Sequence, residues 1–300
     1  MQPEVLPQSL NGKSPVRVGL DIGGSSVKGV AGSGDDSSRV WCKQRMARPA
    51  DDVVAGLAEA ARSVAAGATI LDVGVTVPGI VEDGVVRACT NVPQLVGINL
   101  SEELSAVLGV PVSVVNDGTA AALAEAKQGA GRGVDDVFVA VLGTGVAGAH
   151  VVNGLMQGGA HGQAGELGHL RVPESVEPCS CGSIGCLETV IGAPALQRSW
   201  ALNGGVGGIE GLHEAWMREH AWARAVVENA AQALASGLLT LSALVDPQRV
   251  VIGGGVAEGV PEIVSEAARI AADRATFHRL PEVVSAEFGP WAGAVGSLLS

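Results

Sequence analysis

The sequence is poor in aromatic and in basic residues. It has no tyrosine and 3 phenylalanines, and its 19 Lys and Arg are outnumbered by 31 Asp and Glu, so the formal net charge is −12. Sequence-independent binding of nucleic acid requires clustered Lys and Arg, and binding to an anionic membrane surface requires a basic patch. We therefore expect no nucleic-acid partner and no membrane partner, and the acidic charge is typical of a soluble protein.

Long apolar runs and an export signal are also missing. No run approaches the roughly 18 residues of a membrane span, and residues 1–15 lack the basic and apolar segments of a signal peptide. We expect these residues to form a flexible leader and the protein to be cytoplasmic. Disulfides are rare in that compartment, so clustered cysteines are better interpreted as metal ligands.

Two nucleotide-binding motifs are absent, although glycine is abundant. The sequence has no Walker P-loop, and its 43 glycines among 300 residues are about twice the average usage. Residues 16–32 and 137–154 each predict a strand, a glycine turn and a second strand, which excludes a Rossmann motif because no helix follows the glycines. The repeated hairpin predicts an internal duplication. Together with the glycines at 252–255, it favours a nucleotide cleft where backbone N–H groups hold phosphate and Asp21 reaches a metal-bound phosphate.

Helix-like and strand-like segments alternate after each hairpin. Residues 101–110 predict a helix capped by Ser101, and residues 111–117 predict a strand. Residues 221–245 predict a long helix, and residues 249–255 a buried strand closed by glycines. This alternation indicates an α/β protein built on sheets that are covered by helices.

Asn116 and Asp117 stand where a strand gives way to a helix. Ligands of α/β sheets bind at the carboxyl ends of strands, so Asp117 is placed to act as a general base or to accept a hydroxyl. The alternative is that these residues cap the helix, which is a common role of Asn and Asp. Spacing alone slightly favours the cap.

One histidine and three cysteines are clustered in a short segment with the spacing H-x9-C-x-C-x4-C. They are His169, Cys179, Cys181 and Cys186. Structural zinc binds four Cys or His ligands in a tetrahedron, and one His with three Cys is a complete set. Because four protein ligands leave no open position, we expect a structural zinc ion rather than a catalytic one.

These segments resemble the ROK family, which comprises sugar kinases and related repressors of the actin-like ATPase superfamily. The resemblance rests on DIGGSSVKG, LGTGVAGAHVVNG, AGELGH, CSCGSIGCLE and VVIGGGV, and it runs from Val16 to Ser300. It implies an α/β fold of two actin-like (ribonuclease H-like) lobes with a cleft between them. The expected division is a small lobe at 16–117, to which the last helix at 290–300 returns, and a large lobe at 118–289 with a zinc loop at 166–188.

The resemblance also implies the roles of the site residues. Asp117 would be the catalytic base that takes a proton from a sugar hydroxyl, which then attacks the γ-phosphate of ATP. The implied sugar-binding set is Gly79, Asn91, Asn116, Asp117, Glu166, His169 and Glu188. The implied ATP-binding set is Asp21, Gly23, Gly24, Ser25, Gly143, Thr144, Gly145, Gly254 and Gly255. The implied cofactors are ATP, Mg2+ and structural Zn2+, and a homodimer is expected because it is usual in the family.

The residues after Asp117 depart from the family pattern. Many members have a small residue and then Asn at these positions, whereas Gly118 and Thr119 follow here. Whether Thr119 serves the sugar pocket is therefore open.

The function that the resemblance implies is an ATP-dependent hexose kinase. The expected acceptor is the 6-hydroxyl of glucose or an amino-sugar analogue, such as a glucosamine-type, N-acetylated or 3-amino sugar like kanosamine. One alternative is a sugar-sensing regulator without catalysis. The presence of Asp117 argues against it, because a pure sensor needs no base. The leader of residues 1–15 is also too short for the winged helix-turn-helix domain that repressors of the family carry. Another is a polyphosphate-dependent glucokinase, which the net charge of −12 disfavours.

Overall fold

The computed structural model describes residues 15–24, 26–33, 40–47, 52–89, 92–161 and 163–299. The chain divides into two compact units, of which the first comprises Met1–Gln128 with Pro290–Ser300 and the second Gly129–Gly289. Helix α3 (Asp117–Lys127) belongs to the first unit because it packs against α10 (Ala292–Ser297). The division between the units therefore follows Gln128, whereas the sequence prediction placed it after Asp117.

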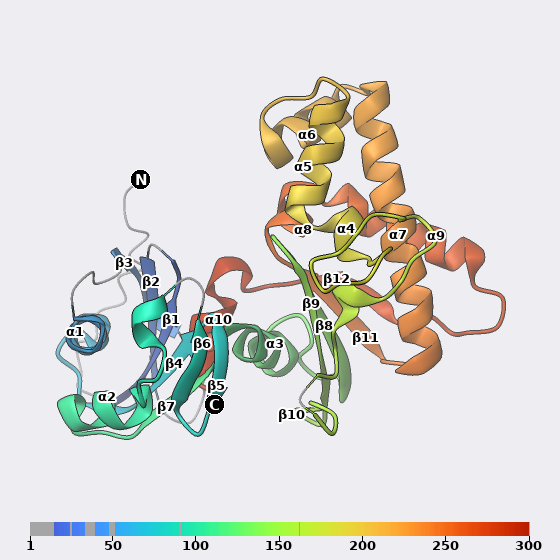
Figure 1. Ribbon diagram of the computed structural model, residues 1–300. Coiled ribbons are helices and arrows are strands. Elements are labelled where there is room, and N and C mark those ends of the chain that lie inside the picture. The colour runs from blue at the N-terminus through green and yellow to red at the C-terminus, as the bar shows by residue number, and fades with distance from the viewer. Residues whose placement is uncertain are drawn as a thin grey trace. The chain divides into compact units, whose positions relative to one another are not determined.

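The first unit is a sheet with helices on both faces (Figure 1). Its strand order is β3-β2-β1-β4-β7, with antiparallel pairing from β3 to β1 and parallel pairing from β1 to β7. The strands are β1 (Val16–Ile22), β2 (Ser26–Ser33), β3 (Val40–Ala47), β4 (Ile70–Val77) and β7 (Val112–Asn116). Helices α1 (Val53–Ala65) and α2 (Leu100–Leu108) cover one face, and α3 and α10 the other. A hairpin of β5 (Gly79–Glu82) and β6 (Val85–Cys89) and the short helix η1 (Pro93–Leu95) complete the unit.

Helix α2 begins one residue before its predicted cap. Its N-cap is Asn99, whose side chain accepts a hydrogen bond from the backbone N–H of Glu102. The predicted cap at Ser101 is wrong, because the hydroxyl of Ser101 donates instead to the carbonyl oxygen of Val112 on the neighbouring strand β7. A contact between distant segments has thus overridden a local signal.

Two glycines explain how α10 approaches the first sheet. Gly19 of β1 and Gly74 of β4 are register partners and lie side by side. A Cβ atom on Gly19 would lie 2.1 Å from the carbonyl oxygen of Ala294, and one on Gly74 would lie 1.8 Å from that of Ser297. Only residues without a side chain permit the backbone of α10 to lie so close.

The second unit repeats the strand order of the first. Its order is β10-β9-β8-β11-β12, again with antiparallel pairing over the first three strands and parallel pairing over the last three. The strands are β8 (Asp136–Leu142), β9 (Val146–Val152), β10 (Leu155–Met156), β11 (Arg249–Gly253) and β12 (Glu282–Ser285). The equal topology is what the two similar glycine hairpins predicted.

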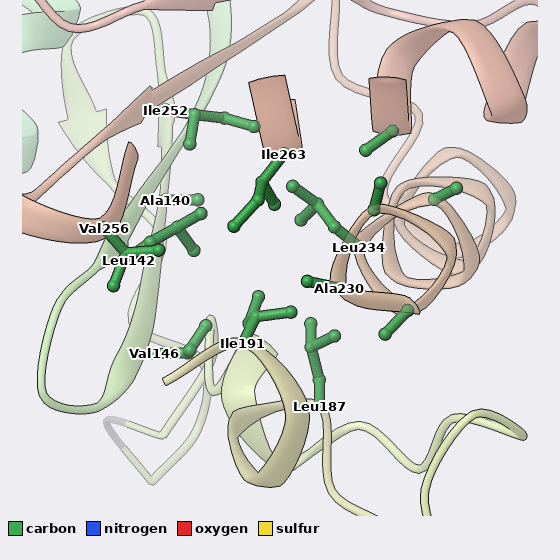
Figure 2. Close-up of a cluster of buried hydrophobic side chains, with 14 of the residues drawn as sticks. Ala140, Leu142, Val146, Leu187, Ile191, Ala230, Leu234, Ile252, Val256 and Ile263 are labelled. Atoms are coloured by element: carbon green, nitrogen blue, oxygen red, sulfur yellow. The ribbon is translucent and has the colours of Figure 1, made fainter. Parts of the chain in front are cut away.

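The helices of the second unit enclose its core. They are η2 (Leu167–His169), α4 (Glu188–Ile191), α5 (Ala193–Leu202), α6 (Gly208–Met217), α7 (Ala221–Leu244), α8 (Gly255–Gly259) and α9 (Glu262–Arg274), and η3 (Gly289–Trp291) leads into α10. Figure 2 shows the centre of this core, where Leu142 of β8, Leu187, Ile191 of α4 and Leu234 of α7 point toward one another. None of the helices in the described part of the chain has the length and apolarity that crossing a membrane would need.

Candidate functional site

The carboxyl edge of the first sheet gathers four of the predicted site residues. Strands β1, β4 and β7 are parallel neighbours, so their carboxyl ends meet at one edge. Asp21 lies near the end of β1, Gly79 begins β5 directly after β4, and Asn116 and Asp117 join β7 to α3. The predicted residues Ser25 and Asn91 lie outside the described residues.

Asn116 is the N-cap of α3. Its side-chain oxygen accepts a hydrogen bond from the backbone N–H of Thr119 (3.0 Å), and its side-chain nitrogen donates to the carbonyl oxygen of Gly79 (2.9 Å). The helix cap that the sequence offered as the alternative role of these residues is therefore present, and Asn116 provides it. The same amide joins two residues of the predicted sugar set, which leaves it one N–H for a ligand.

Asp117 is the first residue of α3, and it is partly buried. One oxygen of its carboxylate accepts a hydrogen bond from the backbone N–H of Gly118 at 2.8 Å. Burial raises the pKa of Asp117, and the negative charge of Asp21 raises it further, while the Gly118 hydrogen bond and the positive charge of Lys28 oppose the shift. A carboxylate with a raised pKa is a stronger base than an ordinary aspartate.

Both oxygens of the Asp21 carboxylate have partners on neighbouring strands. The ammonium group of Lys28 lies 2.7 Å from Oδ2, and the hydroxyl of Thr76 donates to Oδ1 at 2.8 Å. Sequence reasoning missed Lys28 and Thr76. A signal for Lys28 was available, because a hairpin that turns at residues 23–25 places it opposite Asp21.

The first glycine turn closes on itself. The backbone N–H of Gly23 donates to the carbonyl oxygen of Ser26 at 2.8 Å, so this donor is used within the turn. Gly24 is exposed. The phosphate-binding role of this turn stays a prediction.

The carboxyl edge of the second sheet carries the other glycine turns. Gly143, Thr144 and Gly145 follow β8, and the N–H of Gly143 donates to the carbonyl oxygen of Gly145 at 2.9 Å. Gly254 follows β11 with a φ of 95°, and a Cβ atom there would lie 2.4 Å from the carbonyl oxygen of Leu142. The two turns are therefore in contact, and Gly255 beside them is exposed, with open space where a Cβ atom would lie.

Glu188 links the turn after β8 to the zinc loop. It begins α4, and its Oε2 accepts a hydrogen bond from the backbone N–H of Val146 at 2.9 Å. A Cβ atom on Gly145 would lie 2.7 Å from the same oxygen, so a larger residue there would displace the Glu188 carboxylate. The structure thus gives Glu188 a contact with the predicted phosphate turn, and its contact with sugar stays a prediction.

The four predicted zinc ligands lie together. One ligand atom from each of His169, Cys179, Cys181 and Cys186 lies within 4.8 Å of all the others. The sulfurs of Cys181 and Cys186 are 3.7 Å apart, as are Sγ of Cys179 and Nδ1 of His169. Zn–S bonds of about 2.3 Å in a tetrahedron place two sulfurs about 3.8 Å apart, so the donor set fits zinc.

The thiols of this cluster are not equivalent. A hydrogen bond from the backbone N–H of Cys181 lowers the pKa of the Cys179 thiol to about 7. Burial raises the pKa of the Cys186 thiol to about 11. Of these two thiols, Cys179 more readily supplies a thiolate at neutral pH, and a metal ion would displace the proton of Cys186.

His169 presents its two ring nitrogens to different neighbours. Nδ1 faces the sulfur of Cys179, whereas Nε2 lies 3.9 Å from a carboxylate oxygen of Glu166. Glu166 is exposed, with 62% of its side-chain surface accessible. A metal ion on Nδ1 would fix the proton on Nε2, which would then point toward the predicted sugar ligand Glu166.

The zinc loop is fastened to the helices behind it. Ser236 of α7 donates a hydrogen bond to Glu174 at 2.8 Å, and Arg274 at the end of α9 lies 3.6 Å from the same carboxylate oxygen. The hydroxyls of Ser175 and Thr189 are 2.7 Å apart and join the middle of the loop to α4. These contacts hold the ligand segment even where the chain has no regular secondary structure.

Comparisons with known proteins agree with this architecture. The model of the ROK family matches residues 17–299. The kanosamine kinase of Amycolatopsis mediterranei is 32% identical over 268 residues, which are 87% of this chain and 87% of that protein.

Two solved structures are similar over most of their length. The ROK hexokinase from Thermus thermophilus is 32% identical with a TM-score of 0.81, covering 95% of this chain and 97% of that chain. A ROK family glucokinase from Streptomyces griseus in complex with glucose and AMPPNP is 28% identical with a TM-score of 0.73, covering 94% and 98%. The predicted α/β fold class with two actin-like lobes is thereby confirmed.

Proposed function

Since the chain belongs to the ROK family, we propose that it is an ATP-dependent sugar kinase. It transfers the γ-phosphate of ATP to a hexose hydroxyl, with the 6-hydroxyl of glucose or of an amino-sugar analogue as the acceptor. The observation that carries the proposal is Asp117, a partly buried carboxylate with a raised pKa at the start of α3. The relatives named as kanosamine kinase and glucokinase support the same reaction class.

In the proposed reaction Asp117 is the general base. Its carboxylate removes the proton from the sugar hydroxyl while the hydroxyl oxygen forms a bond to the γ-phosphorus of ATP. The bond between that phosphorus and the oxygen bridging to the β-phosphate breaks, so the products are sugar phosphate and ADP, and the proton on Asp117 passes to solvent. Phosphoryl transfer requires mainly positioning and charge stabilisation from the protein, and general-base catalysis increases the rate by about 10²–10⁴-fold.

We assign sugar recognition to the polar groups of the predicted sugar set. Asn116 and the backbone at Gly79 would act together, because one hydrogen bond already joins them. Glu166 and Nε2 of His169 would accept and donate to sugar hydroxyls, and Glu166 would attract the ammonium group of an amino sugar. A sugar that leaves such groups unpaired binds less well, which provides specificity. Glu188 and Asn91 complete the proposed set.

Two metal ions accompany this function. Zinc would be held by His169, Cys179, Cys181 and Cys186, and with four protein ligands it would stabilise the loop without an open position for substrate. Mg2+ would arrive with ATP and be held largely by phosphates and waters. Asp21 fits a role through such a water, because its carboxylate oxygens already accept from Lys28 and Thr76 but retain further lone pairs.

A panel of sugars in an assay coupled to ADP release tests the proposal. Glucose, glucosamine, N-acetylglucosamine, galactose, mannose and kanosamine are compared with ATP as donor, and the best acceptor is then tested with polyphosphate. We expect at least one hexose to be phosphorylated with ATP and little rate with polyphosphate. Folded, zinc-loaded protein that turns over no sugar would refute the kinase and favour the sugar-sensing regulator.

We further propose that the protein is a homodimer, as is usual for the family that the sequence resembles. Sedimentation velocity at several concentrations provides the test. A single species with the mass of one chain throughout would contradict it.

A further inference from the structure

A row of polar side chains crosses three strands of the first sheet. Asp21 of β1 is the register partner of Lys28 on β2 and of Thr76 on β4. The ammonium of Lys28 and the hydroxyl of Thr76 each contact one carboxylate oxygen of Asp21, at 2.7 and 2.8 Å. Asp21 and Thr76 are buried, at 8% and 0% exposure. A buried carboxylate is tolerated when it is paired and hydrogen-bonded in this way.

The second sheet shows that the hairpin does not need this row in order to fold. Val141 has the position in β8 that Asp21 has in β1, next to the last residue of the strand. Its register partners are Ala147 on β9 and Gly253 on β11. The same topology therefore forms with no polar side chain at the equivalent places, which argues that the charged row of the first sheet serves the site.

Within the described part of the chain, few other charged groups face this row. Arg45 on β3 is the register partner of Lys28, is exposed, and donates from Nε to the hydroxyl of Ser26 at 3.2 Å. Helix α10, which covers the row, contributes the residues Ala292–Ser297 and no titratable side chain. Asp117 at the start of α3 is a further titratable group near enough to be affected by the row. The negative charge of Asp21 and the positive charge of Lys28 act on it in opposite directions.

We propose that Lys28 is a positioning residue for phosphoryl transfer, because its ammonium group holds and neutralises the Asp21 carboxylate so that Asp117 can be ionised when it accepts the proton of the sugar hydroxyl. The inference rests on the proposed role of Asp117 as the base. Without Lys28, the uncompensated charge of Asp21 would oppose a second negative charge nearby. Lys28 thus acts through the carboxylates of Asp21 and Asp117 and contacts neither the sugar nor the transferred proton.

The test is the pH dependence of kcat/KM for the best hexose at saturating ATP, from about pH 5.5 to pH 9. The variants are Lys28→Met, which keeps the length without the charge, Lys28→Arg, which keeps the charge, and Lys127→Met as control. Lys127 is exposed at the far end of α3. We expect the acidic limb of Lys28→Met to move to higher pH, with about a threefold or greater loss at the acidic end of the range that is largely regained at alkaline pH. Lys28→Arg and Lys127→Met should follow the unmodified protein.

A second comparison asks whether Lys28 acts through Asp21. In the double variant Asp21→Asn with Lys28→Met both charges are gone, so the acidic limb should return toward its original position, whatever the double change does to the plateau rate. Thermal unfolding and zinc content show whether each variant is folded. If Lys28→Met does not fold, Lys28→Gln takes its place.

Three outcomes would overturn the inference. A loss of the same factor at every pH would show that Lys28 does not act through the ionisation of Asp117. An acidic limb in the double variant equal to that of Lys28→Met would exclude the route through Asp21. Full turnover by Asp117→Asn would show that Asp117 is not the base and would refute the proposed mechanism. If Asp117→Asn is inactive but the loss in Lys28→Met is the same at every pH, only this inference is refuted.

Discussion

Replacing Asp117 by Asn should abolish turnover and stabilise the fold. Asn has nearly the same size, and its side-chain oxygen can still accept the hydrogen bond that the N–H of Gly118 now donates to the carboxylate. The local structure of α3 should therefore persist, and so should sugar binding. Only the ability to accept a proton is lost.

The size of both effects follows from the position of Asp117. A general base contributes about 10²–10⁴-fold, so kcat should fall by that factor, which is about 3–5 kcal/mol of transition-state stabilisation. KM for the sugar should change little. Because burial raises the pKa of Asp117 in the folded state, the folded protein holds its proton more tightly than the unfolded chain does. Its ionisation then costs stability as pH rises from about 4 through the folded pKa, and the cost persists at higher pH.

Two measurements check this prediction. Initial rates give kcat and KM, and thermal unfolding at several pH values gives the stability difference. Asp117→Asn should unfold at a higher temperature than the unmodified protein at pH 7.5, and the gain should vanish toward about pH 4. Asp135→Asn, an exposed aspartate, is the matched control. More than about a tenth of the original kcat would place the base elsewhere, and a lower unfolding temperature at pH 7.5 would refute the electrostatic argument.

Three further variants test the supports of the site. Cys181→Ser should lose zinc, measured by atomic emission after dialysis, and lower the unfolding temperature because metal binding stabilises the loop; unchanged metal content would remove Cys181 from the ligand set. Glu174→Gln weakens the attraction to Arg274 that holds the zinc loop against α9. It should raise KM for sugar about threefold to tenfold at nearly constant kcat, and an equal change in the exposed control Glu177→Gln would contradict this. Gly74→Ala should destabilise by about 1–3 kcal/mol in urea unfolding, because its Cβ would meet the backbone of α10; a neutral result would mean that α10 can shift.

The parts of the fold that depend on neighbouring residues were predictable from the sequence. Both glycine hairpins formed where strand, turn and strand were expected, because the pattern is complete within each segment. The clustering of the cysteines was predictable for the same reason, since Cys179, Cys181 and Cys186 lie within eight residues and a short loop must bring them together.

The parts that depend on distant residues were not predictable. Asn99 and Ser101 are equally good caps by residue type, and a hydrogen bond from Ser101 to the next strand decided between them. Helix α3 was assigned to the second lobe because its partner, α10, lies at the other end of the chain. Lys28 is an intermediate case, because its position opposite Asp21 follows from the hairpin but its ion pair does not.

The duplicated topology divides the chemistry unequally between its two halves. At equivalent edges, the first sheet carries Asp21, Lys28 and Asp117, whereas the second carries glycine turns beside Val141 and Ala147. The proposed base and its charged neighbours Asp21 and Lys28 thus belong to the first unit, and the Gly143–Gly145 turn and the zinc loop belong to the second. Substitutions in the first group should therefore alter kcat and its pH profile. Substitutions in the turns and the zinc loop should alter KM for ATP or sugar, and kinetics in which a zinc-loop variant lost only kcat would contradict this division.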